Sequence, residues 1–317
     1  MSVQAENPTG NATATFRVAL EGVVYTLVDV HDGHDAQFED WYENDHFYAG
    51  GVLAPYVLSG RRWYASQALR ESRFTSPACP LPDPRAGTNL ATYFVTAGGL
   101  RSFYEWINPQ LVTLRSGGRM FADRTHVNTD GYRLERVLSF PGASAVPAHV
   151  VGDHPFAGLF VAYLDASGDG PAEARAAGAR APGARAAGAR AASARAAGAR
   201  AAGARAANAR AANDSAVLPA GTLALSLRPN AGSLTQDSLG LAATQPGMEF
   251  PAVGGTPVRL VLAFLTQPPP ADPEWSAGLA RRVGRLTGSA AVWGGGFRPV
   301  VPGDRSHLAH IRSKDSI

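Results

Sequence analysis

Gly22–Asp29 reads GVVYTLVD and Gly158–Asp165 reads GLFVAYLD, so one apolar pattern occurs twice in the chain. Each stretch begins with glycine, ends with aspartate and has the composition of a buried strand. A second matching pair follows, ATYFVT at Ala91–Thr96 and VLAFLT at Val261–Thr266. A helix-like segment that contains Glu-Trp comes after each member of the second pair. This repetition predicts two similar halves, of which the second is a diverged copy of the first.

The expected elements follow the same order in both halves. In the first half, strands are expected at 17–30, 55–65, 89–96 and 132–139, and helices at 35–49 and 99–116. In the second half, strands are expected at 157–165, 221–228, 257–266 and 290–300, and a helix at 273–287; the region 171–213 replaces the other helix. The order β-α-β-β-α-β is the ferredoxin-like signature. The predicted fold class is therefore α+β, with two tandem ferredoxin-like halves forming an intramolecular dimeric α/β barrel.

Residues 174–213 repeat an Ala/Arg/Gly pentapeptide eight times. Without its eight arginines, the formal net charge of +3 becomes −5. Five residues turn a helix by about 500°, so successive arginines spread around the axis and form no amphipathic face. No aromatic residue alternates with the arginines to stack on bases, which argues against a nucleic-acid partner. We interpret the array as a low-complexity insert; the alternative is a tether that binds acidic surfaces.

The expected organisation has a flexible N-terminus at 1–16, the first half at 17–145, the second half at 155–305 with the insert inside it, and a flexible C-terminus at 306–317. The N-terminus lacks the basic and apolar regions of a signal peptide. No apolar run approaches the roughly 20 residues that cross a bilayer. We therefore expect a cytoplasmic protein with no membrane partner, either a monomer with an internal pseudo-dimer or a homodimer.

The stretch Phe38–Phe47, FEDWYENDHF, carries the candidate site. A helix would place four of its residues on one face, and these are Phe38, Trp41, Tyr42 and Asp45. His46 follows Tyr42 by four residues, at the edge of that face. An apolar face that ends in a carboxylate and an imidazole places titratable groups where water is scarce and where histidine can move a proton. The alternatives are core packing for Phe38 and Trp41 and a simple helix-dipole interaction for His46.

Residues 17–140, through the motifs in the segment 33–66, resemble EthD-like members of the dimeric α/β-barrel superfamily; the second half resembles them only in its order of elements. The resemblance rests on a helix with the pattern W-Y-x-x-x-H, followed by a proline-led strand that ends in GRRW. The matching residues are Trp41, Tyr42 and His46, with Asp45 as a neighbour. Relatives include aromatic polyketide cyclases, cofactor-free monooxygenases, decarboxylases and isomerases. The resemblance implies a small hydrophobic cavity between sheet and helices, in which a His, Tyr or Asp transfers the proton.

Three basic residues outside this helix are further candidates for the cavity. Arg62 ends the second expected strand, where it and Arg61 point to opposite faces, so that one enters the cavity. Arg124 and His126 are expected in a loop before the fourth strand, which would rim the cavity. Arg124 there would bind an anionic substrate. The alternative for both is a solvated loop.

Other motifs in the chain do not indicate a functional site. His31 and His34 lie close together in the sequence but lack a third ligand in a rigid arrangement, so no metal site is expected. Cys79 is the only cysteine, which excludes an internal disulfide and a cysteine-based metal cluster. Gly294–Phe297, GGGF, is expected to be a bulge or a turn. The chain contains no G-x-S-x-G, H-E-x-x-H or dinucleotide-binding pattern, which favours chemistry without a cofactor.

These observations favour a cofactor-independent enzyme, a lyase, isomerase or cyclase of secondary metabolism that acts on a hydrophobic, aromatic or polyketide-like substrate. His46 would be the base or acid, Asp45 its orienting carboxylate, and Tyr42 the hydrogen-bond donor to a developing enolate or phenolate. The substrate-binding residues would be Trp41, Phe38, Arg62, Arg124 and His126. Two alternatives stay open: a non-catalytic protein that binds a hydrophobic metabolite, and a monooxygenase that is cofactor-free or haem-dependent.

Overall fold

The computed structural model describes residues 18–165, 218–230 and 258–312. Three expectations therefore lie outside the described residues: the flexible N-terminus at 1–16, the pentapeptide array at 174–213, and the part of the C-terminus after residue 312.

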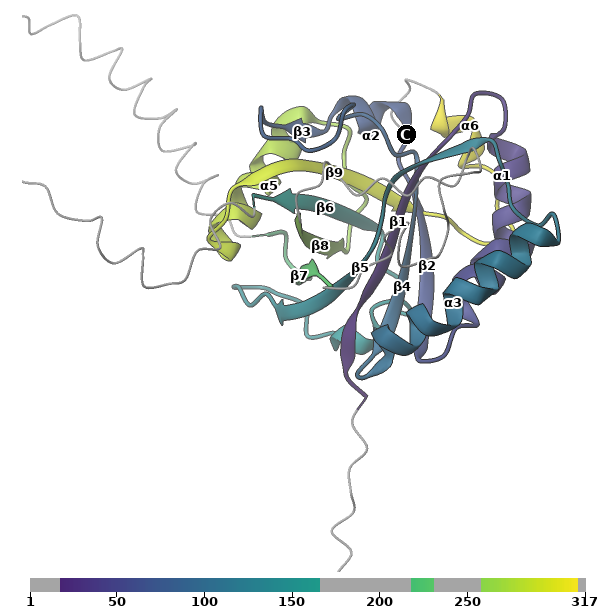
Figure 1. Ribbon diagram of the computed structural model, residues 1–317. Helices are drawn as coiled ribbons and strands as arrows, with labels where there is room; N and C mark the ends of the chain where they lie inside the picture. The colour runs from purple at the N-terminus through teal and green to yellow at the C-terminus, as the bar shows by residue number, and fades with distance from the viewer. Residues whose placement is uncertain (1–17, 166–217, 231–257, 313–317) are drawn as a thin grey trace, which may run out of the picture.

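Nine antiparallel strands form the frame of the described residues (Figure 1). Their bounds are β1 Leu20–Val30, β2 Val57–Tyr64, β3 Phe74–Thr75, β4 Asn89–Thr96, β5 Arg124–Val137, β6 Gly158–Leu164, β7 Leu223–Pro229, β8 Arg259–Leu265 and β9 Ala291–Pro299. The spatial order is β2-β4-β1-β5-β7-β8-β6-β9-β3. Because β2 also pairs with β9, through Trp63 with Pro299 and Tyr64 with Arg298, eight of the strands close into a barrel.

Helices cover parts of the barrel. Their bounds are α1 Asp35–Trp41, the π-helical turns η1 Tyr42–His46 and η2 Tyr48–Val52, α2 Gln67–Glu71, α3 Gly99–Ser116, the 3₁₀ turn η3 Ala148–Val150, α5 Pro273–Thr287 and α6 Leu308–Ile311. Helices α1, α3 and α5 lie on the outer face of the barrel, whereas α2 and η3 contribute Leu69 and Ala148 to the packing of the interior cluster. Figure 1 shows α1 and α3 on one side of the barrel and α5 on the opposite side. In the described part of the chain, every helix is too short or too polar to cross a membrane.

The predicted fold class is wrong. The protein is a closed eight-stranded antiparallel β-barrel with few helices, and not a pair of ferredoxin-like halves in a dimeric α/β barrel. The strands and helices lie close to where the sequence predicted them, but the partners of the edge strands were not predictable from local patterns. β5 pairs with β7, and β2 with β9, so the two halves share one continuous sheet. The closed sheet buries its main core inside itself.

Alternation along the strands divides the side chains between the interior and the exterior of the barrel. In β1, Val23, Tyr25 and Leu27 belong to the interior cluster, together with Trp63 and Trp293, and all five are fully buried. The intervening residues of β1 face outward and form a second apolar cluster with α1 and α3. A third cluster lies between the barrel and α5. The helices therefore cover an outer apolar surface that the strands would otherwise expose to water.

Gly294–Phe297 lies inside strand β9, so the predicted bulge or turn is wrong. Three consecutive glycines occur here because neighbouring side chains fill the space beside the strand. A Cβ added to them in turn would lie 2.7 Å from the side chains of Phe160, Arg73 and Pro269. The glycines let β9 pass close to these groups while it pairs with β6.

The C-terminal segment is ordered further than the sequence suggested. Residues 306–312, expected to belong to a flexible end, include α6. Ile311 is 1% exposed and packs in a small cluster with Tyr64 and Val300. The segment thereby covers the seam where β2 meets β9.

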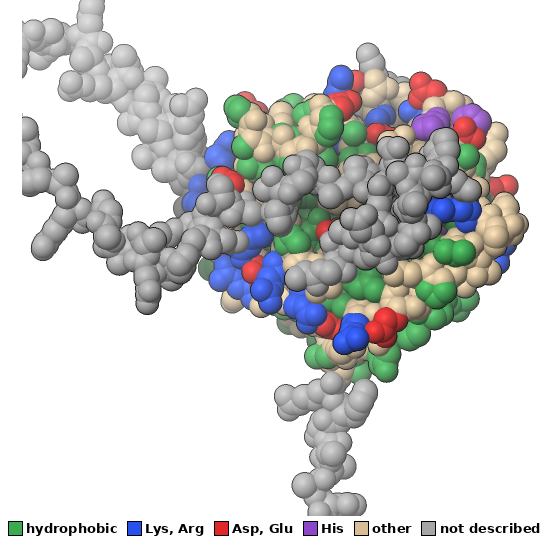
Figure 2. Space-filling view, in the orientation of Figure 1, with side chains coloured by type: hydrophobic (Ala, Val, Ile, Leu, Met, Phe, Trp, Pro, Cys, Tyr) green, Lys and Arg blue, Asp and Glu red, His purple; other side chains and the backbone are tan. Residues whose placement is uncertain are grey.

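The surface mixes charged and apolar side chains of all kinds (Figure 2). Basic side chains gather over the paired strands β5 and β7 in this view. Exposed arginines on these two strands are Arg136 and Arg228. Positive charge is therefore also present on the barrel itself, apart from the arginines of the array.

A pair of Gly→Ala substitutions tests the close packing of the barrel. A Cβ at Gly22 would overlap the backbone carbonyl oxygen of Tyr132 on the paired strand β5, which has no room to move. We expect Gly22→Ala to lower the free energy of unfolding by about 1–3 kcal/mol or more. Gly278, in helix α5, has Arg281 as its nearest neighbour at 3.9 Å. Gly278→Ala should be neutral or stabilise by up to about 1 kcal/mol.

Urea unfolding of both variants measures these differences. Equal effects of the two substitutions would contradict the described contact between β1 and β5.

Candidate functional site

A cavity lies between the outer face of the barrel and the layer formed by α1, η1, η2 and α3. Its apolar wall contains Val24, Val28, Phe103, Ile107, Leu111 and Met120. Its polar lining contains Thr26, Tyr42, His46, Tyr93, Arg124, His126 and Thr129. A largely apolar cavity with a few converging polar groups is the usual form of a small-molecule site.

The cavity is small in this conformation. It offers about 50 Å³ to the centres of water-sized molecules, within a hollow of about 540 Å³ that includes its mouth. The smaller volume has room for about three to five water molecules, whereas an apolar cavity that holds benzene is roughly 150 Å³. A ligand of a few heavy atoms therefore fits, and an aromatic substrate requires the cavity to widen.

A β-bulge in β5 arranges one side of the site. Leu27 pairs with Asn128 and Val28 with His126, so Val127 is an extra residue on β5. The extra residue shifts the alternation of inward and outward side chains along β5. Asn128 therefore points into the barrel, where its side-chain amide donates hydrogen bonds to the hydroxyls of two interior tyrosines. Thr129 then faces the cavity beside Arg124 and His126. Bulges of this kind re-aim side chains next to functional sites.

Two π-helical turns arrange the opposite side. Helix α1 continues into η1 and η2, which carry Tyr42, His46 and Gly50 to the cavity. Gly50 leaves room for the imidazole, since a Cβ there would lie 2.7 Å from Cε1 of His46. π-Helical turns are rare in proteins, and those that occur are frequently found at functional sites.

The imidazole of His46 is held mainly by aromatic neighbours. It stacks on Trp41 with ring centroids 4.2 Å apart and an interplanar angle of 18°, and its edge meets the ring of Tyr42. Its Nδ1 is buried and has no hydrogen-bond partner among the described residues. Burial, together with the positive charge of Arg124, lowers the pKa of His46 to about 3. His46 is therefore a neutral imidazole at physiological pH.

Arg124 brings a buried positive charge to the cavity. Its side chain is 4% exposed, and the guanidinium carbon lies 4.7 Å from the ring centroid of Trp41. Burial lowers the pKa of Arg124 to about 10, so the group remains charged at neutral pH. No carboxylate of the described chain lies within ion-pair distance of it. Its charge acts on both His46 and Tyr42.

Two further hydrogen bonds complete the polar lining. The hydroxyls of Tyr42 and Tyr93 lie 2.9 Å apart, and burial raises the pKa of both groups. Nδ1 of His126 lies 2.7 Å from the hydroxyl of Thr129. Burial, reinforced by Arg124, lowers the pKa of His126 well below its usual range. The tyrosines stay protonated and the histidine stays neutral at physiological pH.

The structure brings four of the predicted site residues together in the cavity: Tyr42, His46, Arg124 and His126. Trp41 and Phe38 lie directly behind them. Trp41 stacks on His46, and Phe38 stacks on Tyr42 with centroids 5.2 Å apart. These two residues therefore position cavity residues and do not line the cavity themselves.

Asp45 has a different partner from the predicted one. Its carboxylate accepts two hydrogen bonds from Arg119, one of them from Nε at 3.0 Å. Arg119 also accepts a bond of 2.8 Å from the indole of Trp41 through its backbone oxygen. The structure therefore gives the imidazole of His46 a stacked ring as its orienting group, while Asp45 and Arg119 hold Trp41 in place from outside.

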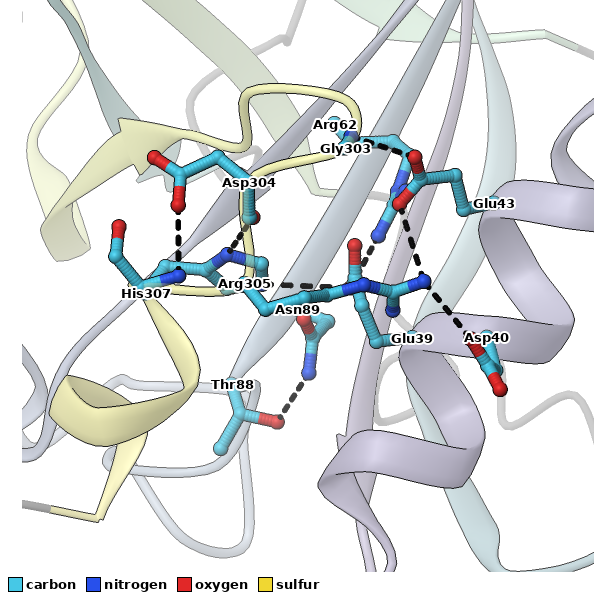
Figure 3. A network of polar contacts seen from close by, with 11 residues as sticks. Glu39, Asp40, Glu43, Arg62, Thr88, Asn89, Gly303, Asp304, Arg305 and His307 are labelled. Atoms are coloured by element: carbon cyan, nitrogen blue, oxygen red, sulfur yellow. Dashed lines mark hydrogen bonds and ion pairs between the residues drawn. The ribbon is translucent and has the colours of Figure 1, made fainter.

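Arg62 turns away from the cavity into a network of polar contacts (Figure 3). Its guanidinium forms an ion pair with Glu39 and lies 3.8 Å from Glu43. The same oxygen of Glu39 lies 3.4 Å from His307 in the C-terminal segment. On its other side the guanidinium faces the ring of Tyr42 at 5.3 Å. Arg62 thus links β2, α1 and the C-terminal segment behind Tyr42.

Arg124 and His126 were predicted in a loop and instead lie on strand β5, whose start the sequence placed too late. Tyr93 and Thr129 were missed as site residues. The position of Tyr93 in the cavity can be deduced from the alternation of side chains along Ala91–Thr96 once the outer face of that strand is known. Thr129 depends on the bulge, for which the local sequence gives no signal.

Among the described residues, no group of three or more His, Cys, Asp or Glu side chains is arranged to hold a metal ion. His31 and His34 lie at the surface near Asp123. No protein-family model matches the chain, and no curated protein has a significantly similar sequence. The function of the site is therefore inferred from the geometry of the residues that line the cavity.

The neutral buried His46 predicts a specific loss of stability in mild acid. The unfolded chain takes up a proton as pH falls below about 6.5, the ordinary pKa of histidine, whereas folded His46 does so only near its pKa of about 3. Between these values the unfolded state binds more protons, so stability decreases as pH falls. From pH 7.5 to 5.0 we expect a loss of up to about 2 kcal/mol from His46, and a loss of the same sign from His126.

Urea unfolding at the two pH values measures this loss. The variant His46→Gln should show a smaller loss than the wild type, by up to about 2 kcal/mol. His31→Gln, at an exposed histidine, is the matched control and should keep the wild-type dependence. An unchanged loss in His46→Gln would show that His46 is not held neutral in the folded protein.

Proposed function

We propose that the protein is a cofactor-independent enzyme that performs acid–base chemistry on a small molecule bound in this cavity, with His46 as the base. The observation that carries the proposal is the buried Nδ1 of His46, which lies in the lining with no hydrogen-bond partner among the described residues. A buried polar atom without a partner costs free energy, and a functional role is a common explanation for one. Tyr42 and Arg124 converge on the same cavity.

These groups suit proton abstraction from a carbon next to a carbonyl group. His46 takes the proton, the electrons of the C–H bond form the carbon–carbon double bond of an enolate, and the carbonyl oxygen becomes negatively charged. Tyr42 donates a hydrogen bond to that oxygen. The raised pKa of Tyr42 keeps its hydroxyl protonated, and the Tyr93 hydroxyl can donate a hydrogen bond to the Tyr42 oxygen. Return of the proton from His46 to another carbon completes an isomerisation. Attack of the enolate carbon on a second carbonyl of the same ligand forms an alkoxide, and transfer of the proton from His46 to that alkoxide completes a cyclisation.

The low basicity of His46 favours a second candidate, a non-catalytic protein that binds a small metabolite. A base with a pKa of about 3 accepts a proton from carbon poorly. Part of this lowering comes from Arg124, and a negative charge beside Arg124 would offset it. The two candidates therefore differ in whether the bound ligand reacts.

Proton exchange with solvent tests the catalytic proposal. Acetylacetone, acetoacetate and pyruvate are incubated with the protein in D₂O, and loss of the α-proton signals is followed by NMR. We expect the wild type to accelerate exchange of at least one of them. His46→Ala should reduce the rate by about 10²–10⁴-fold, and Tyr42→Phe should also reduce it.

His31→Ala is the control at an exposed histidine and should exchange these probes at the wild-type rate. Exchange by the wild type at the buffer rate, or by His46→Ala at the wild-type rate, would refute the catalytic proposal. Saturable binding of a probe without exchange would support the binding protein instead.

A further inference from the structure

We propose that the ligand of this cavity is a small organic monoanion whose carboxylate pairs with the guanidinium of Arg124. The inference rests on the proposed function only in placing the ligand in the same cavity. It names the chemical class of the ligand, and it holds whether or not the ligand reacts.

Arg124 differs from the other deeply buried arginines of the described chain in its partners. Arg62 and Arg73 are each 7% exposed. Arg62 pairs with the carboxylate of Glu39, and Arg73 donates hydrogen bonds of 2.6 Å to two backbone carbonyls. Arg124 is more deeply buried, at 4%, and its guanidinium has neither an ion pair nor a hydrogen bond to a described residue. A buried charge without a partner is strongly unfavourable, so the geometry points to a partner that is not part of the described chain.

The cavity is the place where this partner can lie. Arg124 is part of its lining, and one face of the guanidinium is taken by Trp41. A planar guanidinium binds a carboxylate through parallel hydrogen bonds at its edge, which stays available when a ring covers its face. The hydroxyls of Tyr42 and Thr129 also face the cavity and can donate to the same anion or to a neighbouring oxygen.

The balance of charge selects a monoanion. His46 and His126 are neutral, so Arg124 supplies the single positive charge of the lining. Asp45, the acidic residue next to His46 in the sequence, is paired with Arg119. A second negative charge on the ligand would lie against Phe103, Ile107 or Leu111 and would be buried without a partner.

The volume limits the rest of the ligand. About 50 Å³ of space accommodates a carboxylate with a short carbon chain, and the apolar wall suits that chain. Acetate and pyruvate are therefore suitable probes. Both exist as monoanions at neutral pH.

The pairing would also affect the base. Arg124 contributes to the low pKa of His46, and a carboxylate that neutralises Arg124 removes that contribution. The pKa of His46 would rise on binding, which makes the imidazole a better proton acceptor only when the ligand is present. While Arg124 and Thr129 hold the carboxylate, the single hydroxyl proton of Tyr42 can be donated to an enolate oxygen.

Calorimetric titration with charged and neutral isosteres tests the proposal. Acetate and pyruvate are compared with acetamide and pyruvamide at low ionic strength. We expect the wild type to bind at least one carboxylate about tenfold to a hundredfold more tightly than its amide. Arg124→Gln should lose this preference, and Arg124→Lys should keep part of it. Arg101→Gln, at an arginine with an 89% exposed side chain, is the matched control and should bind like the wild type.

Thermal unfolding gives a second readout that does not depend on measurable heats. Arg124→Gln removes a buried unpaired charge, so the ligand-free variant should unfold at the same temperature as the wild type or higher. Acetate or pyruvate should raise the unfolding temperature of the wild type and not that of Arg124→Gln.

Equal binding of carboxylates and amides, no binding of either carboxylate by the wild type, or retained preference in Arg124→Gln would overturn the proposal. The two proposals can fail separately. Carboxylate binding without proton exchange supports the anion site and contradicts the catalytic role of His46. Exchange of neutral acetylacetone without any carboxylate preference supports catalysis and contradicts the anion site.

Discussion

The pairing of β2 with β9 is the constraint on which the rest of the structure depends. It joins β2 and β9, the two ends of the run of eight neighbouring strands, and so leaves no open edge in the barrel. Closure divides every strand into an interior and an exterior face, and the interior is filled by large side chains such as Trp63 and Trp293. Helix α2 adds Leu69 to this interior, whereas α1 and α3 cover an apolar patch on the outside.

The candidate site arises where this outer cover departs from regular geometry. On the strand side, the bulge at Val127 turns Thr129 outward, and on the helix side two π turns present Tyr42 and His46. The cavity between them combines a buried cation with neutral imidazoles and protonated tyrosines. Local rules are broken here by an unpaired charge, an unpaired nitrogen and irregular backbone, and such departures concentrate at functional sites. The other two deeply buried arginines of the described residues, Arg62 and Arg73, have partners for their charge.

Much of the local structure could be predicted, because it depends on neighbours in the sequence. The apolar run at Gly22–Asp29 indicated strand β1, and the spacing of Phe103, Ile107 and Leu111 fits the single buried face of helix α3. The pairing of β5 with β7 and of β2 with β9 could not be predicted, because the sequence of a strand does not show which other strand it pairs with. The incorrect fold class has this cause: four strands were assigned to each half, and the sheet that unites the halves was missed.

The candidate site divides in the same way. The sequence by itself determined that Tyr42 and His46 occur four residues apart on an aromatic helix and that Arg124 and His126 are nearby candidates. Only the tertiary structure decided that these four residues face one cavity, that Asp45 and Arg62 have other partners, and that Arg124 is buried without a described counter-ion. The physical reason is that burial and charge compensation are properties of the space around a side chain. Distant segments supply that space: β1, β4, β5, α3 and the C-terminal segment.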